Sequence, residues 1–131
     1  MKKLLVSTLM IMTLVMVAFA DTETGADIKF EKTTIDVGEF PEESPVVKTE
    51  FKFTNTGNAP LIIHQAVASC GCTIPQFTKE PIKVGETGVI EVTYNGRNKF
   101  PGKFKKSITI RTNSKHAIMR LFIEGEMIPK K

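Results

Sequence analysis

Residues 46–55 have the sequence VVKTEFKFTN, in which two kinds of side chain alternate. Val47, Thr49, Phe51 and Phe53 fall on one parity, and the residues between them are charged. Successive side chains of a β-strand point to opposite faces of its sheet. The pattern therefore predicts a strand with one buried face and one solvated face.

The same two-residue period recurs along the rest of the chain, and clusters of Gly, Pro, Asn and Ser separate the alternating runs. Six or seven short strands with no helical period predict an all-β fold, a single immunoglobulin-like antiparallel β-sandwich of about seven strands. The strands are predicted at residues 28–37, 46–55, 61–69, 88–94, 103–112 and 117–127, the first of which can split in two.

The apolar parities of these strands predict a shared core. Four of the strands supply large apolar residues to it. The residues predicted to be buried together are Phe51, Phe53, Ile90, Val92, Ile108, Ile110, Leu121 and Ile123.

The first twenty residues have the pattern of an export signal. Lys2 and Lys3 precede an apolar run over residues 4–17, and residues 18–20 (AFA) form an A-x-A cleavage site before Asp21. An uncleaved anchor is the alternative, but the run is short for a membrane span and the small residues favour cleavage. No cysteine follows the run, so we expect a periplasmic or secreted protein that is not a lipoprotein.

The predicted organisation is a signal peptide at residues 1–20, a flexible lead at 21–27, the sandwich at 28–128 and a tail at 129–131. The full chain has 18 basic and 14 acidic residues, and removal of the signal lowers the net charge from +4 to +2. This weak charge argues against a nucleic-acid partner. We expect no membrane span after signal removal.

The two cysteines, Cys70 and Cys72, lie on either side of Gly71. In a flat strand their Cα atoms would be about 6.5–7 Å apart, at the outer limit for a disulfide, but a turn at the glycine would bring them closer. Three interpretations stay open: a structural loop with or without a local disulfide, a redox pair, and two thiolates that bind a metal. A three-residue ring would be strained and easily reduced, which suits exchange better than stabilisation. The pair is predicted in a loop at one end of the sandwich.

A metal is the least favoured of these interpretations. Zinc would need two further ligands, and an extended strand would hold His64 about 20 Å from Cys70. Linear Cu(I) needs only two thiolates, so Cys70 and Cys72 remain candidates for it. No cofactor is expected.

A basic and aromatic cluster is a candidate binding surface. It consists of Arg97, Lys99, Phe100 and Lys103. Such a cluster could bind an acidic polymer or a membrane surface, but a charged hairpin that protects a sheet edge has the same composition.

Several motifs resemble those of a known family: residues 51–57 (FKFTNTG), 60–63 (PLII), 69–75 (SCGCTIP), 84–85 (VG) and 88–90 (GVI). Over nearly all of residues 28–127 the chain resembles a bacterial family of exported domains of unknown function, common in Bacteroides-type bacteria and similar to the Hydin-like immunoglobulin-type domains. The Ser-Cys-Gly-Cys-Thr segment is its most specific part. The resemblance implies a sandwich fold and a Gram-negative envelope, and it implies no catalytic residue or ligand.

The sequence thus predicts a non-enzymatic binding or structural module of the bacterial envelope, whose partner is a protein or another envelope component. The alternative is a thiol–disulfide or Cu(I)-handling protein that uses Cys70 and Cys72.

Overall fold

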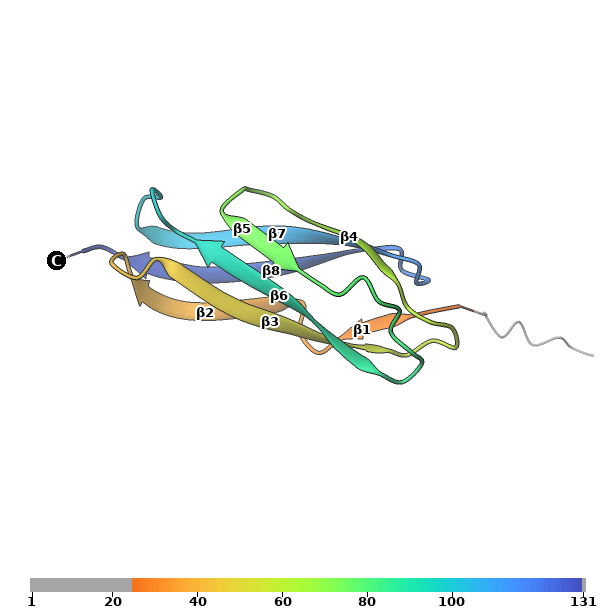
Figure 1. The fold of residues 1–131 in the computed structure, drawn as a ribbon. Coiled ribbons are helices and arrows are strands. Elements are labelled where there is room, and N and C mark those ends of the chain that lie inside the picture. The colour runs from red at the N-terminus through yellow and green to blue at the C-terminus, as the bar shows by residue number, and fades with distance from the viewer. Residues whose placement is uncertain (1–24, 131) are drawn as a thin grey trace, which may run out of the picture.

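The computed structural model describes residues 25–130 of the 131-residue chain. Two four-stranded sheets pack face to face, and the described residues contain no helix (Figure 1). The predicted immunoglobulin-like sandwich is confirmed. The strands are β1 (Ile28–Phe30), β2 (Thr34–Pro41), β3 (Val46–Asn55), β4 (Ile63–Ala68), β5 (Thr73–Gln76), β6 (Thr87–Asn95), β7 (Gly102–Thr112) and β8 (Ile118–Ile128).

The first sheet has the strand order β1-β3-β6-β5, and the second has the order β2-β8-β7-β4. In the first sheet β6 pairs with β3 along the whole length of β6, from Val46 opposite Asn95 to Thr54 opposite Thr87. In the second, β7 and β8 pair antiparallel from Gly102 opposite Met127 to Arg111 opposite Ile118. These two long ladders are the centres of the sheets.

The core lies between the two ladders. All eight residues predicted for it are at most 1% exposed, so the predicted strand faces are confirmed. Leu61 and Met127 are equally buried, and so is the polar side chain of Asn55, which the alternation did not identify.

The predicted first strand splits in two, and its halves belong to different sheets. β1 pairs antiparallel with β3, whereas β2 pairs parallel with β8. The expectation of a wholly antiparallel sandwich is therefore wrong at this strand. The chain crosses between the sheets after Phe30 and then continues beside a strand of its own direction.

The short strand β5 was not predicted. It lies at the edge of the first sheet, beside β6. The Asn95 N–H donates to the Cys72 carbonyl (2.7 Å). Because hydrogen-bonded pairs alternate along the ladder, the backbone nitrogen of Pro75 points away from β6, so the ladder loses no hydrogen bond at this residue. Proline is tolerated at such an edge position, although in a sequence it argues against a strand.

The predicted signal peptide and its cleavage site lie outside the described residues, as does most of the predicted lead. The last residues of that lead, Gly25 to Asp27, lie against the sandwich: Gly25 N–H donates to Asn58 Oδ1 (2.6 Å), and Ala26 is buried. A search of the described residues found no helix with the length and apolarity needed to cross a membrane.

Candidate functional site

The cysteine loop, residues 69–72, connects β4 of the second sheet to β5 of the first. Ser69 N–H donates to the Ser107 carbonyl on β7 (2.9 Å), and the Cys72 carbonyl accepts from Asn95 on β6. The loop is thus hydrogen-bonded to both sheets. Its position directly after the strand that contains Ala68 is the position predicted from the sequence.

Cys70 and Cys72 form a disulfide whose Cα atoms are 5.3 Å apart. This separation is shorter than a flat strand would give, because the chain turns at Gly71. The Cys72 N–H also donates to Cys70 Sγ (3.2 Å), while Cys72 itself is buried against the core. Both cysteines of the chain are joined here, so neither is a thiolate in this structure. Elsewhere too, the described residues contain no cluster of three or more metal-binding side chains.

A second loop faces the cysteine loop across a shallow hollow. This is the basic turn, residues 95–99, where Arg97 N–H donates to Asn95 Oδ1 (3.0 Å) and Asn98 has a φ of 64°. Gly96 is packed so closely that a Cβ would lie 2.8 Å from Met127 Sδ. The hollow is lined by Gly71, Cys72, Ile74, Asn95, Arg97, Asn98 and Lys99.

The candidate binding residues do not form one cluster. Arg97 and Lys99 line the hollow beside Cys72, and Phe100 follows them with 97% of its surface exposed. Lys103 lies opposite Glu126 on β8 and lines a different hollow, together with Glu39. The chain crosses from the first sheet to the second between Asn95 and Gly102, and this crossing separates Lys103 from the other three.

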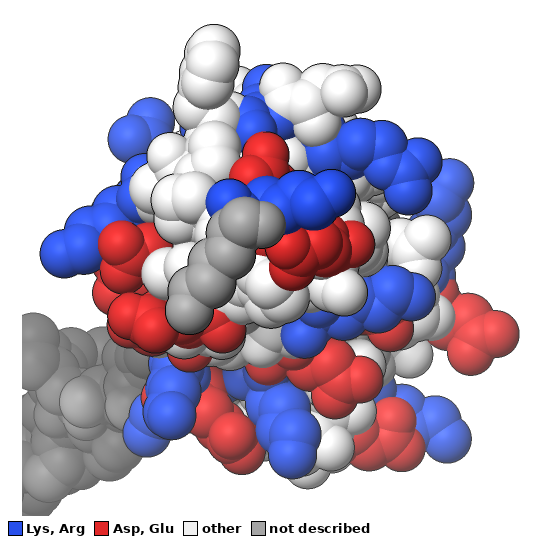
Figure 2. Space-filling view, turned by 90° about the vertical axis from the view of Figure 1, so that its left-hand side faces the viewer, with Lys and Arg blue, Asp and Glu red and all other residues white. Residues whose placement is uncertain are grey.

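Figure 2 looks onto this end of the molecule. Cationic and anionic side chains are interspersed over it, and uncharged atoms project along its upper margin. The surface as a whole is therefore not a strongly basic field, so any preference for an anionic group must be local. The hollow with Arg97 and Lys99, which has no acidic residue in its lining, is such a place.

A group of aromatic rings lies next to the basic turn, which begins directly after Tyr94. The rings of Tyr94 and Phe104 are stacked with centroids 3.9 Å apart, and Phe40 meets both edge-on. Burial raises the pKa of Tyr94 above its ordinary value, so its hydroxyl stays neutral at physiological pH. We assign these rings a packing role.

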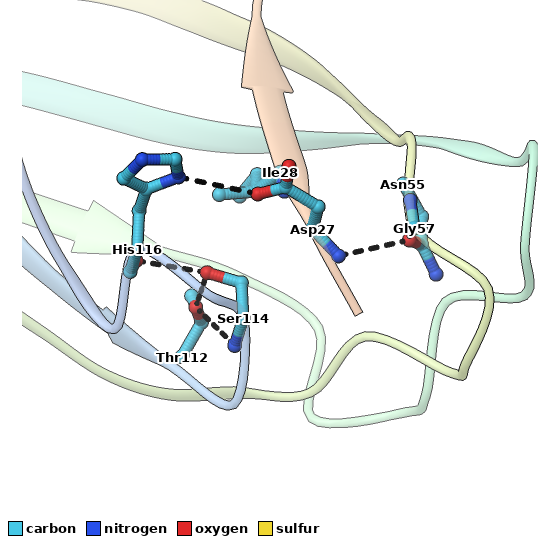
Figure 3. Close-up of polar contacts among 7 residues, drawn as sticks. All are labelled: Asp27, Ile28, Asn55, Gly57, Thr112, Ser114 and His116. Carbon is cyan, nitrogen blue, oxygen red and sulfur yellow. Dashed lines mark hydrogen bonds and ion pairs between the residues drawn. The ribbon is translucent and has the colours of Figure 1, made fainter. Parts of the chain in front are cut away.

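The opposite end of the sandwich has a polar network that contains Asp27, Ser114 and His116 (Figure 3). These are the residue types of a catalytic triad, but their contacts differ from it. Ser114 Oγ donates to the backbone carbonyl of His116 (2.8 Å), not to its ring, and Ser114 is buried. His116 Nδ1 lies 3.3 Å from Asp27 Oδ1. A serine nucleophile needs a hydrogen bond from its hydroxyl to the ring of the base, and Ser114 does not make that bond. The network instead connects the loop between β7 and β8 to Asp27, just before β1.

Comparisons with solved structures agree with the fold. A protein of unknown function from Porphyromonas gingivalis W83 is 18% identical to this chain, with a TM-score of 0.66. The match covers 83% of this chain, and it spans only 50% of that protein's length. The ASH/PapD-like domain 7 of human CEP192 is 8% identical, with a TM-score of 0.63 over 82% of this chain and 89% of the domain. The periplasmic chaperone SfaE is 9% identical, with a TM-score of 0.54 over 79% of this chain and 58% of the chaperone.

At these identities the likenesses establish the architecture alone. A search of curated proteins found no match. The family comparison is more specific, because one family model matches residues 28–127, which is almost the whole described sandwich. The chain therefore belongs to the family described as protein of unknown function (DUF1573).

Proposed function

We propose that this protein is an exported, non-enzymatic binding module of the bacterial envelope, and that it contacts a protein partner with the end of the sandwich that has the cysteine loop and the basic turn. Export by a signal peptide cleaved before Asp21, and the likeness to Hydin-like domains, are parts of this proposal. The observation that carries it is Phe100, which is 97% exposed beside Arg97 and Lys99. Aromatic residues and arginine are the side chains that most often anchor protein interfaces.

The architecture of the neighbouring structures supports this proposal. They include a periplasmic chaperone and a PapD-like domain, and in such sandwiches function resides in loops and edges, not in a deep pocket. Rigid support favours binding as well: the disulfide, the Asn95 hydrogen bonds and the aromatic group hold the two loops in place. A preformed surface loses less entropy when its partner binds.

The test is site-specific photo-cross-linking in living cells. A photoreactive residue at position 100 is expected to form an adduct with an envelope protein, whereas one at Ile118, exposed at the far end of the β7–β8 ladder, is not. Arg97→Glu with Lys99→Glu should weaken the position-100 adduct at least about tenfold, because it reverses the local charge.

The matched control is Lys29→Glu with Lys32→Glu, which makes the same charge change in and just after β1. Equal adducts at positions 100 and 118, or an equal effect of the two charge reversals, would contradict the proposal.

The disulfide itself supports a second candidate, thiol–disulfide exchange with a partner dithiol, in which the partner is oxidised to a disulfide while Cys70 and Cys72 become two thiols. The specific observation is that Cys72 lines the same hollow as Arg97 and Lys99. Cations close to a cysteine favour its thiolate, and therefore the reduced form. The reduced pair would also supply the two thiolates that Cu(I) binding needs.

This candidate predicts the reduction potential of the pair. Because the ring contains only three residues, we expect a potential above about −300 mV in glutathione buffers. Arg97→Gln with Lys99→Gln should lower it by about 15–30 mV, up to a tenfold change in the equilibrium constant. The same two changes at Lys29 and Lys32 serve as the control. A potential below about −300 mV, or no effect of the cations, would remove this candidate.

A further inference from the structure

The four edges of the two sheets differ in how they are protected against pairing with another strand. β1 has only three residues, β2 is interrupted at Gly38 and ends at Pro41, and β5 contains Pro75. Short strands, irregularities and proline are the usual devices that prevent edge-to-edge association. β4 is the exception: it is six residues long, regular after Gln65, and contains no Pro, Gly, Lys, Arg, Asp or Glu.

The backbone of β4 has unused hydrogen-bonding groups at this edge. Ser69 N–H donates to the Ser107 carbonyl on β7, which fixes the alternation of the ladder. Gln65, Val67 and Ser69 therefore bond to β7, and the N–H and C=O groups of Ala66 and Ala68 point away from it. In the described part of the chain, no loop or side chain bonds to either alanine's backbone.

We propose that β4 pairs with β4 of a second copy of this chain, antiparallel across a two-fold axis at Val67, so that the two second sheets become one continuous sheet. This inference is independent of the proposed function. Ala66 of each copy would exchange two hydrogen bonds with Ala68 of the other, which uses all the free groups just named. An antiparallel pair of identical strands is the simplest closed arrangement of an isologous dimer.

The side chains favour this occupant. The pairing places the two Val67 side chains directly opposite each other, and each is 48% exposed in the single copy. Gln65 of each copy would lie opposite Ser69 of the other. No like charges meet along the strand, because β4 contains no Lys, Arg, Asp or Glu. A strand meant to stay solvated would ordinarily have a charge at one of these positions.

Sedimentation velocity on the processed protein, from about 1 μM to about 1 mM, tests the proposal. We expect reversible, concentration-dependent dimers. Val67→Lys should raise the dissociation constant at least about tenfold, because two lysines then face each other. Ala68→Pro should do the same, since it removes an N–H that only the second copy uses. Val84→Lys, at a comparably exposed valine outside the strands, is the control and should leave the dimer unchanged.

A disulfide trap reports the register. Val67→Cys should form a disulfide-linked dimer under mild oxidation, because directly opposite residues of a non-hydrogen-bonded pair have Cα atoms about 4.5 Å apart. Val84→Cys should not. Far-UV circular dichroism verifies that each variant is folded. A protein that stays monomeric throughout the range, or a dimer that Val67→Lys and Ala68→Pro leave intact, would overturn the proposal.

Discussion

Replacing Phe53 with alanine is expected to lower the free energy of unfolding by about 3–5 kcal/mol. Phe53 is 1% exposed, and its ring centroid lies 5.6 Å from that of Phe30. It is paired with Gly88 on β6, where an added Cβ would lie only 2.5 Å from the ring. The ring thus fills space that the neighbouring strand leaves open, and its removal would leave a cavity in the core.

Denaturant unfolding measures this loss, and the chain has a matched control. Phe100→Ala removes the same ring from a position that is 97% exposed, so it should change the free energy of unfolding by less than about 0.5 kcal/mol. A loss below about 1 kcal/mol for Phe53→Ala would mean that the β3–β6 register is wrong.

The alternation in the sequence identified the strand faces because the order of apolar and polar residues within each strand indicates which of its faces is buried. β3 was predicted with its observed bounds, Val46–Asn55, since the alternation is strong and a turn follows it. Alternation does not say which strand lies beside which. The parallel pairing of β2 with β8 was therefore missed, because it depends on where the chain crosses between sheets.

The candidate site was predicted in its parts but not in its assembly. Arg97, Lys99 and Lys103 were grouped because they are close in sequence, yet the crossing between sheets puts Lys103 on another surface. The cysteine loop was placed correctly at the end of a strand. The sequence did not predict that the cysteine loop lines the same hollow as Arg97 and Lys99. This arrangement depends on the pairing of β5 with β6, and Pro75 argued against a strand at β5.

Asn55 shows a further limit of sequence reasoning. In the sequence it begins a turn-like segment, and turn asparagines are ordinarily solvated. In the structure it is 1% exposed and anchors three segments of the chain. Its Nδ2 donates to the carbonyls of Ala59 (2.8 Å) and Ile82 (2.9 Å). Its Oδ1 accepts from Gly57 N–H (3.0 Å) and from Asp27 N–H (3.5 Å), and Figure 3 shows the bond from Asp27. Hydrogen bonds from a side chain to distant backbone groups leave no pattern in the sequence.

Asn55→Asp is accordingly expected to lower the free energy of unfolding by about 3–5 kcal/mol. The change is nearly isosteric, so it creates no cavity. It replaces the Nδ2 donor with an oxygen that faces the carbonyls of Ala59 and Ile82, and it places a negative charge at a position that is 1% exposed. Both carbonyls lose a hydrogen bond at once.

Asn95→Asp is the matched control for this substitution. The Asn95 side chain accepts one hydrogen bond, from Arg97 N–H, and a carboxylate oxygen can accept it equally well. We expect this variant to change stability by less than about 0.5 kcal/mol in the same denaturant titration. Equal losses at the two positions would show that the cost comes from charge alone. A loss confined to Asn55→Asp would show that the donors of one buried amide hold together the turn after β3 and the connection before β6.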